Sequence, residues 1–160
     1  GESGKVIGVD MTPEMLKLAR QNAAKGGYNN VEFRLGEIEH LPVADNSVDA
    51  IISNCVINLA LDKQQVFNEM YRVLKPGGRI SVSDIVATAE IPREVRNDLA
   101  KIASCIAGAE RVDNVRAMLE KAGFAGIHIN PQEGSGEMIR GWAPGADQFV
   151  GSFLIEAVKA

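Results

Sequence analysis

The stretch KVIGVDMTPE, residues 5–14, starts with apolar residues and ends with the signals that begin a helix. Its first six residues predict a buried β-strand that closes on an acid, Asp10. Thr12 then fits the N-cap, Pro13 the first helical position and Glu14 the positive end of the helix dipole. The stretch therefore predicts a strand followed directly by a helix, the repeating unit of an α/β fold.

The rest of the chain repeats this alternation. Runs rich in Val, Ile and Ser predict strands at residues 31–35, 48–53 and 79–84, and a final pair at 127–129 and 149–158. Amphipathic runs predict helices from Pro13 to the Gly26–Gly27 pair and at residues 63–74, 93–107 and 113–121, with a tight turn at 75–78. Helices between the early strands indicate a mostly parallel sheet, whereas the Gly- and Pro-rich loop between the last two strands predicts an antiparallel hairpin at one edge.

The composition is that of a globular protein, because 46% of the 160 residues are hydrophobic and 24% are charged. We expect a single domain over residues 1–160. The net charge of −4 and the pI near 5.2 argue against nucleic acid or an anionic membrane as partner. We expect no targeting peptide and no membrane span, and two cysteines make no disulfide framework. A cytoplasmic protein with reduced thiols and a small-molecule substrate is the resulting hypothesis.

Ligands of an open α/β sheet bind beyond the carboxyl ends of its strands. The residues at these ends are Asp10–Met11, Gly36–Ile38, Asn54–Cys55 and Asp84. Asp10 either accepts the hydroxyls of a ribose or caps the next helix, and Met11 either packs on an adenine or belongs to the core. Glu37 and Ile38 either contact an adenine or are a solvated acid and a core aliphatic residue.

Several of these segments together resemble the class I methyltransferases that use S-adenosylmethionine. The matching segments are residues 6–11 with 13–16, 35–42, 45–49 and 72–79. The Leu-Lys-Pro-Gly-Gly turn at 74–78, preceded by Asp-x-Ser-x-Asp, is typical of the ubiquinone/menaquinone-type branch. Within that branch, residues 53–59 (SNCVINL) and 105–109 (CIAGA) resemble the arsenite methyltransferases.

The resemblance implies a Rossmann-like sheet and methylation of trivalent arsenic, with S-adenosylmethionine as cofactor. It assigns five residues to that cofactor, with Asp10 and Met11 at the ribose and adenine, Glu37 and Ile38 at the adenine side, and Asn54 at the methionine part. It assigns Cys55 and Cys105 to As(III), which fits the preference of a soft centre for thiolates. The arsenic lone pair is then the nucleophile, so the residues need only position the reactants, and a thiol reductant is the further partner.

The chain departs from the family pattern at its start. The acidic Gly-rich loop of the first motif, and the family's further cysteine or cysteines, would lie upstream of Gly1. We therefore expect a methyltransferase domain that is incomplete at its N-terminus, lacks the first strand and binds the cofactor poorly. An open sheet edge would favour association between chains.

Other functions stay open from the sequence. A methyltransferase of the same branch acting on a quinone or another small molecule predicts no dependence on thiols, and each cysteine alone fits a small buried hydrophobic residue. The absent first motif favours a noncatalytic fragment that serves as a binding or assembly module. The Tyr71–Lys75 spacing of a short-chain dehydrogenase is a weak signal, because Lys75 ends a helix and no Gly-x-Gly-x-x-Gly loop is present.

Overall fold

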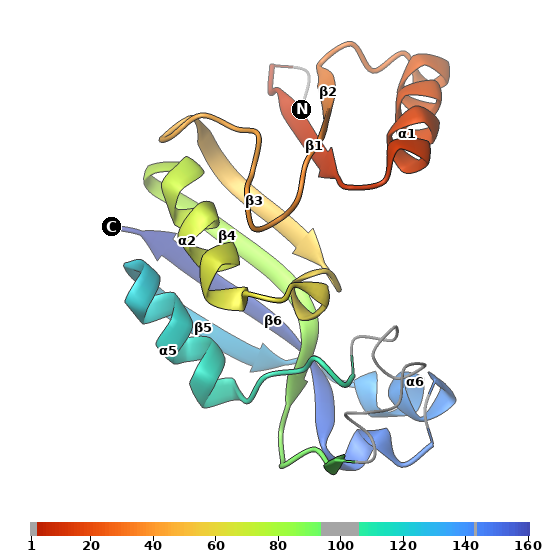
Figure 1. Cartoon of the computed structure of the whole chain (residues 1–160), viewed down its shortest axis with the longest axis vertical. Helices are drawn as coiled ribbons and strands as arrows, with labels where there is room; N and C mark the ends of the chain where they lie inside the picture. The colour runs from red at the N-terminus through yellow and green to blue at the C-terminus, as the bar shows by residue number, and fades with distance from the viewer. Residues whose placement is uncertain (1–2, 94–105, 143) are drawn as a thin grey trace.

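The computed structural model describes residues 3–93, 106–142 and 144–160 and alternates strands with helices (Figure 1). The strands are β1 (Val6–Asp10), β2 (Val31–Leu35), β3 (Val48–Asn54), β4 (Leu74–Ala87), β5 (Phe124–Pro131) and β6 (Val150–Lys159). The helices are α1 (Pro13–Gly26), α2 (Lys63–Val73), α5 (Val112–Ala122) and α6 (Ser135–Trp142), with short 3-10 turns η1 (Ile57–Leu59) and η2 (Ala146–Gln148). No described helix is long and apolar enough to cross a membrane.

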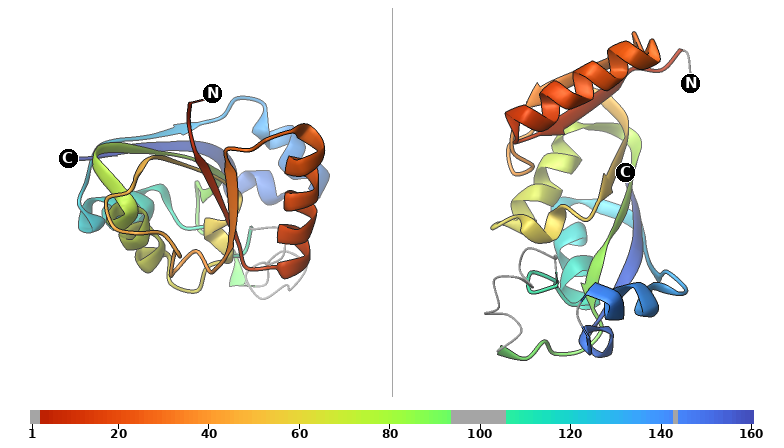
Figure 2. Two further views of the ribbon diagram at one scale, coloured as in Figure 1. Left: turned by 90° about the horizontal axis from the view of Figure 1, so that it is seen from above. Right: turned by 90° about the vertical axis from the view of Figure 1, so that its right-hand side faces the viewer.

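The strands form two sheets. One contains β1 and β2 in parallel, and the other has the order β3-β4-β6-β5. In the larger sheet β3 is parallel to β4, while β6 is antiparallel to both β4 and β5. The predicted C-terminal hairpin is therefore confirmed, with β5 at the edge. Figures 1 and 2 show α2 and α5 together on one face of the larger sheet and α1 beside the smaller one.

Local sequence explains where the helices begin and end. Thr12 stands at the N-cap of α1 as predicted, but in the described structure its side chain makes no capping bond; instead Asp10 Oδ1 accepts the Thr12 N–H at 2.8 Å. Gly27 ends α1 in the left-handed region, at φ 69°. The N-cap of α2 is Asp62, whose carboxylate accepts the Gln65 N–H at 3.0 Å.

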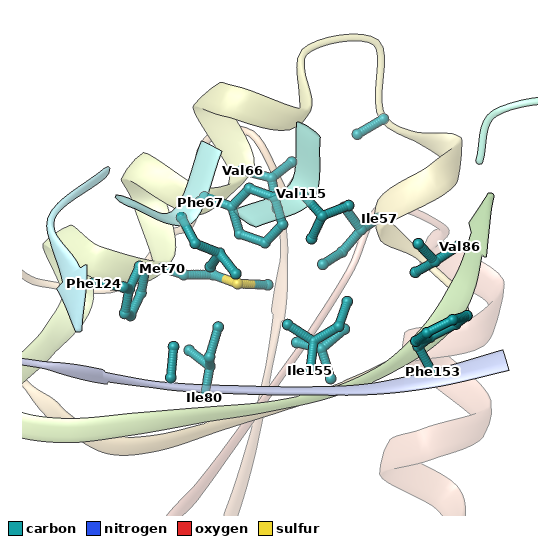
Figure 3. Packing of buried hydrophobic residues seen from close by; sticks show 14 of the residues in the cluster. Ile57, Val66, Phe67, Met70, Ile80, Val86, Val115, Phe124, Phe153 and Ile155 are labelled. Atoms are coloured by element: carbon teal, nitrogen blue, oxygen red, sulfur yellow. The ribbon is translucent and has the colours of Figure 1, made fainter. Parts of the chain in front are cut away.

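The main core lies between the larger sheet and the pair α2 and α5. Figure 3 shows Phe67 and Met70 of α2 pointing toward Ile80 and Ile155 on the sheet. Each such side chain, when fully buried, contributes about 1.5–3 kcal/mol to folding. A second cluster, called here the lower core, consists of Ile85, Ala87, Ile91, Ile106, Ala109, Ile139, Ala146 and Val150. Cys55 and Phe149 pack against it.

Three details differ from the predictions. The turn at 75–78 is an irregularity inside β4, because β3 pairs Val48 with Leu74 and then Ala50 with Arg79. The loop before β6 contains α6. Its Ser135, Gly136 and Gly141 interrupt the apolar spacing by which the sequence would have indicated a helix. Of the helix predicted at 93–107, residues 94–105 lie outside the described part, and residues 106–107 are in a turn rather than a helix.

The edges of β1 and β3 are open within the described residues. There β1 pairs with β2 and β3 pairs with β4, and no described strand joins the two sheets. Ile52, in the middle of β3, is 86% exposed, which is unusual for an aliphatic residue of a parallel strand. Association of chains through these edges stays a prediction.

Candidate functional site

The carboxyl ends of β1 and β3 point the same way in Figure 1, and β4 runs parallel to β3. The predicted site residues on these strands therefore lie on one side of the molecule. Asp10 is half-buried at the end of β1, where its backbone oxygen accepts the Gly36 N–H at 3.1 Å and so joins the ends of β1 and β2. Met11, directly after it, is 69% exposed and is not a core residue.

The loop after β2 carries Glu37 and Ile38. Glu37 is exposed, and its backbone oxygen accepts the His40 N–H at 3.1 Å in a tight turn. Ile38 is half-buried and packs against the main core. Both positions thus agree with the simpler interpretation, a solvated acid and a core aliphatic residue, and their contact with an adenine stays a prediction.

A charged pair fixes this loop to α2. Arg72 donates to both carboxylate oxygens of Glu69 at 2.7 Å, and to the backbone oxygens of Leu41 at 3.0 Å and Val43 at 2.9 Å. Glu69 in turn accepts the Leu41 N–H at 2.8 Å. The Arg72 guanidinium holds the pKa of the Glu69 carboxyl below its usual value. The Glu69–Arg72 ion pair therefore anchors the loop after β2 to α2.

The turn after β3 carries Asn54 and Cys55. Asn54 is exposed at the strand end, as the sequence predicts. Cys55 has φ 51°, a left-handed conformation that costs a residue other than glycine about 1–3 kcal/mol. Its N–H donates to the Ser83 backbone oxygen at 2.8 Å, and its side chain packs against the lower core. Burial raises the pKa of the Cys55 thiol, and the nearby Asp84 carboxylate raises it further.

Asp84 is a buried acid beside this turn, with 3% of its surface exposed. Its carboxylate accepts the Ile57 N–H at 3.0 Å, the Asn58 side-chain amide at 3.1 Å and the Ile85 N–H at 2.8 Å. Burial raises the pKa of the Asp84 carboxyl, and these hydrogen bonds oppose the rise. Sequence reasoning placed Asp84 at a strand end without giving it a role, although a lone acid in an apolar strand was the available signal.

A distant segment, residues 106–109, packs onto the same turn. Ile106 is fully buried in the lower core, which Cys55 also contacts. A Cβ built on Gly108 would lie 2.2 Å from the Asn58 backbone oxygen, so only a glycine permits this approach. Cys105, the second predicted arsenic ligand, lies outside the described residues. Its sequence neighbour Ile106 belongs to the lower core, against which Cys55 also packs.

A matching family model decides the classification. It is described as a methyltransferase domain and matches residues 1–123. The chain belongs to this methyltransferase family. The fold of the methyltransferase domain agrees, because the structure of an arsenic(III) S-adenosylmethionine methyltransferase from Chlamydomonas reinhardtii superposes with a TM-score of 0.75 at 33% identity, covering 99% of this chain and 56% of that one.

Curated relatives of the domain include arsenite methyltransferases. That of Halobacterium salinarum is 54% identical over 157 residues, which are 98% of this chain and 40% of the relative. That of Aquipseudomonas alcaligenes is 43% identical over 131 residues, which are 78% of this chain and 38% of the relative. These findings confirm the resemblance read from the sequence. The chain spans about 40% of the length of these relatives.

Proposed function

We propose that the methyltransferase domain takes part in transfer of the methyl group of S-adenosylmethionine to trivalent arsenic bound by Cys55 and Cys105. The observation that carries the proposal is the packing of residues 106–109, which directly follow Cys105, onto the turn that holds Cys55. Residues 106–109 lie beside the turn that holds Cys55, and this contact supports the proposal. The similarity to arsenite methyltransferases supports the same chemistry.

The residues at the strand ends fit the cofactor. S-adenosylmethionine supplies an electrophilic sulfonium methyl group when bound. The Asp10 carboxylate, at the end of a parallel strand, is suited to the hydroxyls of its ribose, and the exposed Met11 to its adenine. Asn54 would hold the methionine part, with Glu37 and Ile38 at the adenine side. Exposed apolar side chains near these strand ends, Leu35, Leu59 and Leu61, suit an aromatic base.

The raised pKa of the Cys55 thiol is compatible with arsenic binding. As(OH)3 is neutral at physiological pH, and each thiol that binds it replaces one hydroxide. The thiol proton and the displaced hydroxide leave together as water, so no free thiolate needs to accumulate. Two thiols therefore yield a dithiolate As(OH) centre and two waters.

Methyl transfer then needs position rather than a proton shuttle. The arsenic lone pair forms the new As–C bond while the electrons of the broken C–S bond stay on the leaving sulfur. Arsenic is oxidised from As(III) to As(V) in this step, so a thiol reductant is required before a further transfer. Holding the reactants about 3–3.5 Å apart in the correct orientation can lower the barrier by about 7–11 kcal/mol. Reduced thiols are the ordinary state of cysteine in the cytoplasm, which is the location we propose.

The test is stoichiometric binding of arsenite, followed by native mass spectrometry and by the near-ultraviolet absorbance of As–S bonds. Wild-type chain is expected to bind one arsenic atom, and Cys55→Ser and Cys105→Ser are each expected to lose it while circular dichroism stays unchanged. Retained binding in either serine variant would remove the arsenic assignment. A chain that binds S-adenosylmethionine but no arsenite would instead support a methyltransferase for another small molecule, and a chain that binds neither would support a noncatalytic module.

A further inference from the structure

Asp84 joins two elements that are far apart in the sequence. It lies on β4, and the turn that it contacts follows β3. Within the described structure, the donors to its carboxylate are neutral groups, two from the turn at Ile57 and Asn58 and one from its own neighbour Ile85. Because a buried carboxylate is costly, a merely structural position here would be better filled by an uncharged residue.

The turn that Asp84 contacts contains the strained Cys55. Residues 83–85 of β4 hold it at four points. The Cys55 N–H donates to Ser83, the Ile57 N–H to Asp84, and the Asn58 amide to both Asp84 and the Ile85 backbone oxygen, the last at 2.6 Å. A left-handed residue persists only where its surroundings over-determine it. Together with the pairing of Asn54 with Ser83 in the sheet, these anchors flank Cys55 and meet that requirement.

The consequence is a fixed direction for the Cys55 side chain. The same Asn58 whose amide binds Asp84 presents its backbone oxygen to Gly108. Fixing the turn therefore also fixes the surface on which residues 106–109 rest. We propose that Asp84 is a positioning residue for Cys55, and that its buried carboxylate locks the turn so that the Cys55 thiol faces residues 106–109. This inference rests on the proposed function of the two cysteines.

Two measurements test it on the full chain. The first is arsenite affinity in the wild-type background. Asp84→Asn keeps the shape but places an amide group against one of the N–H donors, so we expect the dissociation constant to rise at least about tenfold, equal to about 1.4 kcal/mol. The second is the pH dependence of thiol modification in a Cys105→Ser background, where Cys55 is the remaining thiol. Removing the carboxylate is expected to shift this titration to lower pH.

Glu110→Gln is the matched control. Glu110 lines the same small cavity as Asp84, together with Lys63, and its carboxylate accepts from Asn114 rather than from the turn. It is expected to leave both the arsenite affinity and the thiol titration unchanged. Equal effects of Glu110→Gln and Asp84→Asn would overturn the inference, because the loss of either negative charge from the cavity would then explain the changes without any role for the hydrogen bonds of Asp84.

The other outcomes are also decisive. A folded Asp84→Asn chain with wild-type affinity and an unshifted titration would overturn the inference. If Asp84→Asn does not fold, Asn58→Ala takes its place, because it removes one bond to Asp84 and one to the Ile85 backbone oxygen. A wild-type arsenite affinity in that variant would equally overturn the inference. If the wild-type chain binds no arsenite, the proposed function fails, while the thiol titration still decides whether Asp84 controls Cys55.

Discussion

Replacing Gly108 with alanine tests the contact between residues 106–109 and the turn after β3. The added Cβ would lie 2.2 Å from the Asn58 backbone oxygen and 3.2 Å from its carbonyl carbon. An ordinary C···O contact is about 3.3–3.6 Å, so the two backbones must separate by about 1 Å. Gly108 is not among the glycines with positive φ, and the strain is therefore steric alone.

Overpacking of this kind costs about 1–3 kcal/mol, which lowers the melting temperature of a domain of this size by about 2–12 °C. Because a separated segment also moves away from the turn that holds Cys55, arsenite affinity is expected to fall in parallel. Differential scanning calorimetry and an arsenite titration measure the two effects. The control is Gly136→Ala in α6, where a Cβ meets no described atom within 4 Å and helix propensity predicts equal or slightly higher stability.

Wild-type melting temperature together with wild-type arsenite affinity in Gly108→Ala would refute this reasoning. It would mean that the segment and the turn do not depend on one another in solution. A lower melting temperature with wild-type arsenite affinity would show that the contact between Gly108 and Asn58 stabilises the fold but does not affect arsenite binding.

Other predictions concern the fold. Lys159 is 7% exposed and donates to Asn46, Tyr71 and Leu74, so Lys159→Met is expected to cost about 3 kcal/mol in urea unfolding. Because the pKa of Glu69 is lowered in the folded protein, its carboxylate stabilises the fold at pH values above its ordinary pKa of 4.5. This stabilisation is lost as the pH falls through the folded-state pKa, so Glu69→Gln should flatten the acid side of a curve of unfolding free energy against pH. The open strand edges predict concentration-dependent association, which a monodisperse monomer in sedimentation velocity would contradict.

The elements with strong local signals could be predicted from the sequence. The Pro13 start of α1 and the glycine that ends it were found because they satisfy local backbone requirements. The helix α6 was missed, since its glycine and serine residues give a weak period and its single deeply buried residue, Ile139, is held by the lower core. The turn at 75–78 was placed correctly along the chain, but its inclusion in β4 depends on pairing with β3.

The candidate site likewise contains residues that the sequence predicts and residues whose role depends on tertiary contacts. Asp10, Asn54 and Cys55 lie at strand ends, as the general rule for α/β sheets predicts. The roles of Asp84 and Gly108 could not be predicted in this way. One depends on a hydrogen bond across 27 positions of sequence and the other on a backbone contact across 50, and neither leaves a periodic signal.

Patterning alone determined the class of this protein, because strand and helix periods, helix caps and motif segments are local properties of neighbouring residues. Tertiary structure alone decided that Ile38 packs in the core, that Met11 is exposed, and that the Cys55 turn meets residues 106–109. The physical reason is that burial, charge pairing and close backbone approach arise between segments that only folding brings together. Residue types can suggest the chemistry of a site, but the distances and directions within the site are set by how the chain packs.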